Sequence, residues 1–394
     1  MRNRACGKTH LILPISFLFY TALIVTTFSM IFYARDRFGA SVSLIGWLAA
    51  LPHLCYFCGC FLLRPVYRYL LPRHWLIASS VSAALLLIGI LSVRSLALLF
   101  LLYGLFGFSQ SLFWPPLMGW LSFAKEQQAL NTALGRFNLA WSGGNIVAPF
   151  IAGYLLQRAL SVPFEVAALI MIAISPAVLL VSRICPRIRN DRRKEAIGGE
   201  RENAEDRSTP LRYPAWIGLF AAYVILGITM SIFPLYLREE IGFPETRIGA
   251  LLLLRALSST GTFVLLARLS FWQFNTRLMI AGQAAIIPAA ALLAFARSLP
   301  ALSLVLAVFG ALFALSYNNS LFHGVTGSIR RATRMAVHEG LLTAGMVTGS
   351  AIGGVLYQPG SFLRVVLFGC ALVAAAVLAQ IALASAFLRR DSTP

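Results

Sequence analysis

Apolar residues run along this chain in long continuous stretches, separated by short polar ones. Each run is about 20 residues or longer, enough to cross the roughly 30 Å hydrocarbon core of a bilayer as a helix. The runs do not alternate apolar and polar residues, as the strands of a membrane barrel would. The pattern predicts an all-α polytopic membrane protein with twelve spans, at residues 11–33, 41–63, 74–93, 97–121, 129–157, 163–183, 213–237, 246–268, 277–296, 299–320, 334–357 and 361–388.

Composition points to the same class of protein. Hydrophobic residues make up 59% of the 394 positions and charged residues 12%, with a mean hydropathy of +0.78. A soluble chain of this length could not bury so much apolar surface. The first run follows Arg2, Arg4 and Lys8, but no small-residue cleavage site follows it cleanly. We therefore expect a retained helix rather than a signal peptide.

The net charge of +19 would suit a nucleic-acid partner, but its distribution favours another explanation. Most of the arginines and lysines fall in the loops on one side of the predicted spans. The positive-inside rule makes this side cytoplasmic. We expect a multi-pass inner-membrane protein with both termini in the cytoplasm, in contact with lipid and not with nucleic acid.

One polar stretch is much longer than the others and divides the apolar runs into two sets of six. Residues 184–212 are charged, contain glycine and show no periodicity. Such a segment is typical of a flexible linker, which we place in the cytoplasm. The predicted organisation is an N-terminal six-helix bundle at 1–183 and a C-terminal six-helix bundle at 213–394.

The two halves resemble each other in sequence. YARDRFGASVSLIG, from Tyr33, aligns with YLREEIGFPETRIG, from Tyr236, and QSLFW, from Gln110, aligns with NSLFH, from Asn319. Gly144 and Gly153 align in the same way with Gly345 and Gly354. Matches in one order with a nearly constant offset predict two parallel repeats, related by an axis along the membrane normal, around a central cavity.

The fifth predicted span combines polar groups with small residues. Asn138, Ser142 and Asn145 are spaced i, i+4, i+7, so they form one stripe that we expect to face a wet substrate path. Small residues let helices approach closely. We expect packing or conformational roles for this span's Gly135, Gly144, Pro149 and Gly153, and for Gly345, Gly349 and Gly354 in the eleventh span.

The spacing Gly135-x8-Gly144-x3-Ala148-Pro149-x2-Ala152-Gly153 resembles the fifth-span antiporter signature of the major facilitator superfamily, in which the alanines are usually glycine. The resemblance implies a twelve-helix transporter that works by alternating access, and the signature implies export. Two departures weaken a drug/proton antiporter assignment. Leu63 replaces the aspartate of the usual loop between spans two and three. Tyr103 stands where the drug antiporters usually have an arginine in span four.

Glu339 is the one acidic residue that falls well inside a predicted span. A carboxylate there is costly and is usually functional. One hypothesis is that Glu339 takes up and releases a proton, with His338 assisting. The alternatives are a gate ion pair with Arg136, which lies at a similar depth in span five, and a capped glutamate with a structural role.

Arg255, in the eighth span, lies nearer the membrane midplane. An arginine at this depth suits an anionic group of the substrate, which a guanidinium can hold with two hydrogen bonds. Snorkelling of the long side chain, or pairing with carbonyl groups, is the alternative.

Polar and aromatic residues recur at matching positions of the fourth and tenth spans. A wall that mixes amide, imidazole and aromatic groups suits an amphipathic organic solute. The candidate binding residues of this wall and of the neighbouring spans are Gln110, Trp114, Tyr317, Asn319, His323, Trp141, Tyr20 and Tyr223.

The sequence therefore predicts a secondary transporter for a small organic solute, with proton-coupled export as the first hypothesis. An organic-anion uptake carrier and a non-transporting assembly or delivery factor of the same fold remain alternatives. We see no nucleotide loop, metal-ligand spacing or nucleophile triad, so we expect neither an enzyme nor a bound cofactor or metal. We expect a monomer.

Overall fold

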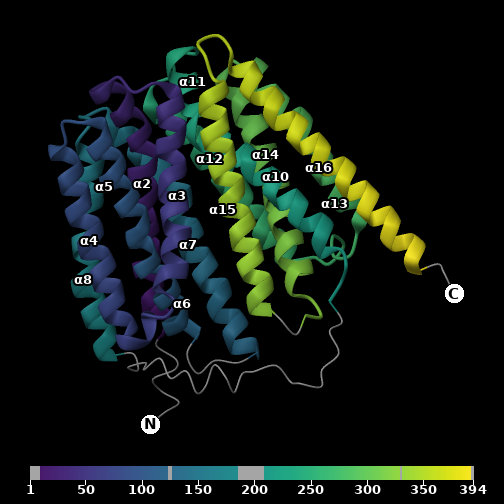
Figure 1. The fold of residues 1–394 in the computed structure, drawn as a ribbon, viewed down its shortest axis with the longest axis horizontal. Helices are drawn as coiled ribbons and strands as arrows, with labels where there is room; N and C mark the ends of the chain where they lie inside the picture. The colour runs from purple at the N-terminus through teal and green to yellow at the C-terminus, as the bar shows by residue number, and fades with distance from the viewer. Residues whose placement is uncertain (1–8, 123–126, 185–207, 329–330, 392–394) are drawn as a thin grey trace. The chain divides into compact units, whose positions relative to one another are not determined.

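The computed structural model describes residues 9–122, 127–184, 208–328 and 331–391, which are mostly helical and contain no strand (Figure 1). Three short 3₁₀ helices, η1 (Thr9–Ile12), η2 (Tyr67–Tyr69) and η3 (Gln110–Leu112), accompany the α-helices. The α-helices are α2 (Leu13–Phe38), α3 (Val42–Leu63), α4 (Pro72–Ser92), α5 (Leu96–Ser109), α6 (Trp114–Ser122), α7 (Gln127–Leu156), α8 (Val162–Ile184), α10 (Arg212–Ser231), α11 (Phe233–Glu239), α12 (Glu245–Arg268), α13 (Thr276–Phe295), α14 (Leu299–Val325), α15 (Arg331–Leu356) and α16 (Phe362–Asp391).

Twelve segments of the described residues are long and apolar enough to cross a membrane. Each overlaps one of the twelve predicted spans, so the predicted fold class is confirmed. The linker predicted at 184–212 lies largely outside the described residues, because the structure describes nothing between 185 and 207.

Two of the spans are interrupted helices. The fourth span is α5 followed by η3 and α6, and the break precedes Pro115 and Pro116. The seventh span is α10 followed by α11, and Pro234 stands in the first turn of α11. Proline lacks the backbone N–H of a regular helix and its ring collides with the preceding turn, which accounts for both breaks.

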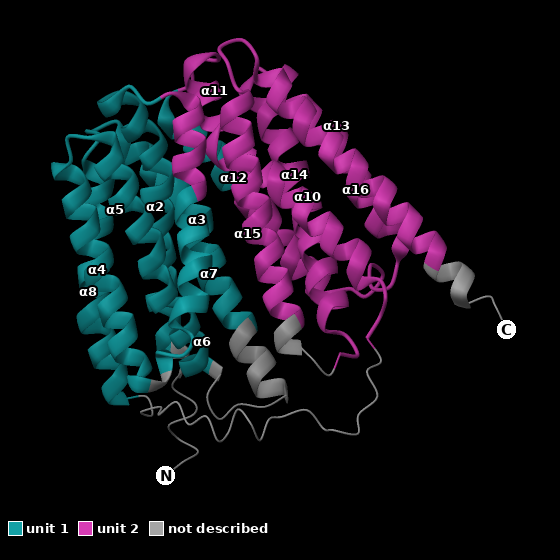
Figure 2. Ribbon diagram, viewed as in Figure 1, with its two compact units in different colours: residues 1–40, 51–198, 244–253 teal, residues 41–50, 199–243, 254–394 magenta. Residues whose placement is uncertain are grey.

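The described residues belong to two compact units, coloured separately in Figure 2. Unit 1 comprises Met1–Ala40, Leu51–Gly198 and Pro244–Leu253, and unit 2 comprises Ser41–Ala50, Gly199–Phe243 and Leu254–Pro394. Each unit thus follows one half of the sequence, except that the beginnings of α3 and α12 belong to the opposite half's unit.

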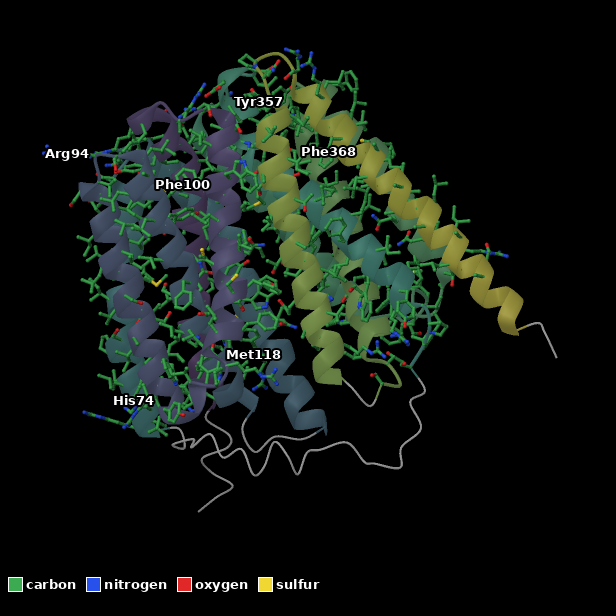
Figure 3. The ribbon with its side chains drawn as sticks, in the orientation of Figure 1. His74, Arg94, Phe100, Met118, Tyr357 and Phe368 are labelled. Atoms are coloured by element: carbon green, nitrogen blue, oxygen red, sulfur yellow. The ribbon has the colours of Figure 1, made fainter. Side chains whose placement is uncertain are left out.

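The two units repeat one pattern of helix neighbours. In unit 1, α2 packs on α7 and α8, and α4 packs on α8 and α5. In unit 2, α10 packs on α15 and α16, and α13 packs on α16 and α14. His74, near the start of α4, and Arg94, just after its end, lie at opposite ends of unit 1 in Figure 3, so α4 runs the length of that unit. The helices that correspond in the sequence repeat therefore have corresponding neighbours in the two units.

Paired glycines bring the central helices of each unit into contact. A Cβ atom at Gly144 of α7 would lie 2.9 Å from the carbonyl oxygen of Phe17 in α2. A Cβ atom at Gly345 of α15 would lie 2.7 Å from the carbonyl oxygen of Phe220 in α10. Both distances are below ordinary van der Waals contact, so glycine is required for the observed spacing. The two pairs occupy matching positions of the repeat.

Further glycines hold the beginnings of α3 and α12 in the unit of the opposite half. In unit 2, a Cβ at Gly46 of α3 would lie 2.9 Å from the Cα of Gly354 in α15. In unit 1, Gly249 of α12 lies against the backbone of Pro149 in α7, and Gly153 lies against the backbone of Glu245. These contacts anchor the beginnings of α3 and α12 in the units that receive them.

Candidate functional site

Helix α7 carries a polar face in unit 1. Arg136 and Asn138 are exposed, Asn145 is half-buried and Ser142 is buried. The Nε1–H of Trp141 donates a hydrogen bond of 3.1 Å to Oδ1 of Asn138, which places these two residues on one side of the helix. Amide and guanidinium groups are costly against hydrocarbon, so this face of a membrane-spanning helix suits contact with water or solute.

An aromatic surface adjoins this polar face. We define the aromatic surface as Tyr20 of α2, Trp114 of α6 and Trp141 of α7, all of them half-buried. The ring of Tyr20 lies 5.9 Å from that of Trp114 and 5.3 Å from that of Trp141, measured between centroids. Each of these rings is thus amphipathic, with an apolar body and a polar O–H or N–H edge.

Buried phenylalanines fix the aromatic surface from behind. Phe19 and Phe113 are stacked with ring centroids 3.6 Å apart, and neither is measurably exposed. Both rings meet Trp114 edge-on, at 5.4 and 5.0 Å, and Phe137 meets it at 6.1 Å. Gln110, in η3, is 7% exposed and so lies within the unit, close in sequence to this cluster.

Unit 2 contains a related aromatic group. Tyr223 of α10 lies 5.1 Å from Phe313 of α14, and Tyr317 of α14 lies 5.4 Å from Phe263 of α12. Tyr223 and Tyr317 are half-buried. Tyr223 is the repeat counterpart of Tyr20, so each unit presents a tyrosine from its most buried helix beside aromatic neighbours.

His338 and Glu339 of α15 point in different directions. His338 is 1% exposed, and its Nδ1 lies 2.8 Å from Oγ of Ser320 in α14. Glu339 is exposed. Successive residues of a helix are about 100° apart, which explains the divergence. His338 therefore belongs to the interior of unit 2, whereas Glu339 is an exposed residue of the same helix.

The two candidate arginines have different environments. Arg136 is exposed in unit 1. Arg255 of α12 is 2% exposed and belongs to unit 2. The Arg255 carbonyl accepts a hydrogen bond of 3.0 Å from Ser259 Oγ, which also lies 2.9 Å from the carbonyl of Gly310 in α14. In this structure Arg255 is thus packed between helices, and a role for it in solute binding stays a prediction. So does the ion pair of Arg136 with Glu339, which would join the two units.

Two further candidates from the tenth span are interior residues. Asn319 and His323 are each 1% exposed, and the His323 ring lies among Phe274 and Phe322 at 5.4 and 5.1 Å. Their predicted place in a solute-binding wall remains untested. Gly135 also differs from the other packing candidates, because a Cβ there would meet no described atom within 4 Å.

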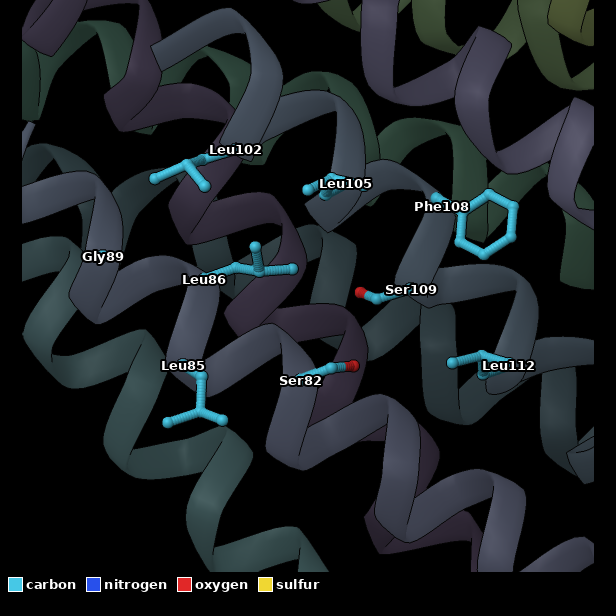
Figure 4. Close-up of a pocket in the computed structure, with 9 residues that line it drawn as sticks. All are labelled: Ser82, Leu85, Leu86, Gly89, Leu102, Leu105, Phe108, Ser109 and Leu112. Atoms are coloured by element: carbon cyan, nitrogen blue, oxygen red, sulfur yellow. The ribbon is translucent and has the colours of Figure 1, made fainter. Parts of the chain in front are cut away.

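A groove on unit 1 is lined mainly by apolar side chains, unlike the polar face of α7. It lies between α4 and α5, has a volume of about 410 Å³, and is lined mainly by leucines (Figure 4). Leu85 and Leu105 at this groove are 64% and 45% exposed. With only serine hydroxyls as polar lining, it suits the acyl chains of lipid rather than a polar solute. The described residues contain no group of three metal-ligating side chains.

Comparison with known proteins decides the family. The Major Facilitator Superfamily matches the chain over residues 12–328, which is most of its length. The chain belongs to the major facilitator superfamily. It is therefore a multi-pass membrane protein of a transporter family, in agreement with its twelve apolar helices. No curated protein sequence matches it significantly.

Solved transporters share the fold of this superfamily member at low sequence identity. A mutant of the nucleoside transporter NupG is 16% identical with a TM-score of 0.76, and the match covers 95% of this chain and 99% of that one. A bacterial homologue of the human lysosomal transporter Spinster, in an inward-facing, unoccupied conformation, is 12% identical with a TM-score of 0.77 and 98% coverage of both chains. A POT family transporter in complex with a thioalcohol-conjugated peptide is 13% identical with a TM-score of 0.75 and 96% coverage of both.

Proposed function

We propose that this superfamily member is a proton-coupled exporter of a small amphipathic organic solute. Glu339 carries the proposal. It is an exposed acidic residue within a membrane-spanning helix, at the repeat position of Asn138 on the polar face of α7. A carboxylate at such a position lowers the stability of the protein, so it is expected to have a function. We propose that this function is to exchange a proton with bulk water.

The coupling that we propose needs only one ionisable group. When the Glu339 site is open to the side of higher proton concentration, the carboxylate accepts a proton and becomes neutral. After the protein reorients, the proton leaves to the other side and the carboxylate is restored. Solute moves outward during the opposite reorientation, so that one proton entering is exchanged for solute leaving. Both termini face the cytoplasm in this scheme, and the membrane is the inner membrane, as the distribution of basic residues favours.

The proposed solute contacts lie on the polar face of α7 and the aromatic surface. Asn138, Ser142 and Asn145 supply hydrogen bonds, and Tyr20, Trp114 and Trp141 supply apolar area with polar edges. In unit 2, Tyr223 and Tyr317 supply the corresponding aromatic groups. This mixture suits an organic molecule that has both a ring or chain and hydrogen-bonding groups. Gln110, Asn319, His323 and Arg255 are buried here, so they would contact solute only in another conformation.

Uptake of an organic anion is the second candidate. The exposed Arg136 on the same face of α7 favours it, because a guanidinium in a membrane-spanning helix can hold a carboxylate or phosphate. Transport assays with variants of the protein in proteoliposomes distinguish the two proposals. Under the first proposal, Arg136→Gln retains proton-linked exchange of neutral or cationic solutes. Under the second, Arg136→Gln abolishes anion uptake and Glu339→Gln leaves it intact.

A further inference from the structure

Helix α14 carries a polar stripe toward the interior of unit 2. Ser316, Asn319, Ser320 and His323 are spaced i, i+3, i+4 and i+7, so they lie on one side of the helix. None of the four is more than 7% exposed. A side of a membrane helix that is both polar and buried must find hydrogen-bond partners inside the bundle.

Neighbouring helices supply some of these partners. Ser316 Oγ donates to Oε1 of Gln283 in α13 at 3.1 Å, and Ser320 Oγ lies 2.8 Å from Nδ1 of His338 in α15. Gln380 of α16 donates from Nε2 to the carbonyl oxygen of Pro214 in α10 at 2.8 Å. Five helices of unit 2 therefore contribute polar groups to this interior.

Two of the amides lie beside the same glycine of α10. A Cβ at Gly218 would lie 2.5 Å from Nε2 of Gln380 and 2.8 Å from Oε1 of Gln283. The two glutamines thus take the space that a side chain at position 218 would need. They come from α13 and α16, which pack on each other and on α10.

Several polar atoms of this interior still have no hydrogen-bond partner. Gln283 Nε2, Gln380 Oε1, Asn319 Oδ1 and His338 Nε2 are buried and unsatisfied, and each belongs to a side chain at most 2% exposed. Burying one such atom without a hydrogen-bond partner lowers the stability of the protein by on the order of 1–3 kcal/mol. The lipid outside cannot satisfy them, so the missing partners must lie within the bundle.

We propose that unit 2 encloses bound water, held by Gln283, Gln380, Asn319 and His338. The unsatisfied atoms include both a donor, Gln283 Nε2, and acceptors, Gln380 Oε1 and Asn319 Oδ1. An anion would satisfy only the donor and a cation only the acceptors, whereas water satisfies both. Buried waters typically make about three hydrogen bonds to groups of this kind. We call this set of four residues and its water the hydrated core.

The hydrated core is a binding site inside one unit, and it does not depend on the proposed transport function. It joins α10, α13, α14 and α16, while the Ser320–His338 contact attaches α15. Water at His338 Nε2 also gives this buried imidazole a hydrogen-bond partner despite its 1% exposure.

Hydroxyl-radical footprinting of the full-length protein in detergent tests for the water directly. Radicals generated from bound water label the side chains beside it, even when bulk solvent does not reach them. We expect His338 to be labelled, and Phe309 of the same unit, which is 0% exposed, to stay unlabelled. A His338 as unreactive as Phe309 would overturn the proposal.

Replacement of the glutamines gives an independent test through the sign of a stability change. If the core is hydrated, Gln283→Met and Gln380→Met each remove a ligand of the water and lower the melting temperature by several degrees. If the core is dry, each change loses the one hydrogen bond of the amide, to Ser316 or to Pro214, but also removes its unsatisfied atom, so the two effects offset and the melting temperature stays unchanged or rises. Gln157→Met is the control, because Gln157 is exposed and bonds only to Thr246 at 3.0 Å. A rise in both core variants, or shifts no larger than the control's, would reject bound water.

Discussion

Replacing Gly345 by alanine should destabilise the protein, although alanine is the better helix former. A Cβ at this position would lie 2.6 Å from Cβ of Tyr223 and 2.7 Å from the Phe220 carbonyl oxygen. Carbon atoms in contact prefer about 3.5–4.0 Å, so α10 and α15 would have to separate by roughly 1 Å. Backbone and Cβ atoms cannot rotate away as the end of a flexible side chain can.

Two opposing contributions to the free energy of unfolding decide the stability of the Gly345→Ala variant. Glycine to alanine inside a helix gains about 1 kcal/mol in helix propensity. Forcing a methyl group into a packed contact costs about 1–3 kcal/mol. The net loss is therefore up to about 2 kcal/mol, which in a chain of 394 residues lowers the melting temperature by up to about 2–3 °C.

Gly261→Ala provides the matched control for this experiment. Gly261 lies in α12, and a Cβ there would meet no atom within 4 Å, so only the propensity gain applies. Thermal unfolding of both variants in one detergent should lower the melting temperature for Gly345→Ala and leave it unchanged or higher for Gly261→Ala. Equal shifts in the two variants would refute the argument from close helix contact.

Three further substitutions test other contacts. Asn138→Ala removes a proposed solute contact that also accepts a hydrogen bond from the Trp141 indole; we expect about 5-fold weaker solute binding, equivalent to about 1 kcal/mol, and unchanged binding would argue against this face of α7 as the solute site. Tyr357→Phe removes a 2.6 Å hydrogen bond to the Glu240 carboxylate; thermal unfolding should show a loss of about 1–2 kcal/mol, and an unchanged midpoint would contradict this. Gly249→Val pushes α12 away from the Pro149 backbone and should reduce solute flux several-fold. Gly261→Val, in open space on the same helix, should leave the flux unchanged, and equal flux in the two variants would count against a role for the contact with Pro149.

The spans could be predicted from sequence because lipid leaves the backbone few options. Every N–H and C=O in hydrocarbon needs an internal partner, so long apolar runs become helices. Pro115 and Pro116 likewise mark the break in the fourth span. The different directions of His338 and Glu339 follow from helix geometry and agree with their burial and exposure.

Other features depend on contacts between distant helices and leave little trace in the sequence. The beginnings of α3 and α12 join the unit of the opposite half because of where Gly46 and Gly249 meet their partners. A glycine in an apolar run does not reveal which helix will approach it. Gln283 and Gln380 could have been noticed as single amides in apolar spans, but nothing local indicates that both lie against Gly218.

The central claim is that Glu339 couples solute export to proton entry, and a proton-flux assay tests it most directly. Proteoliposomes with an acidic interior and a pH-sensitive dye would be challenged from outside with a panel of aromatic amphipathic cations, neutral solutes and organic anions. For the native protein we expect at least one solute to release protons from the vesicles. With Glu339→Gln that release should disappear, while binding of the same solute, measured as a raised melting temperature, persists. Proton release that is equal in the native and Glu339→Gln proteins would contradict the account.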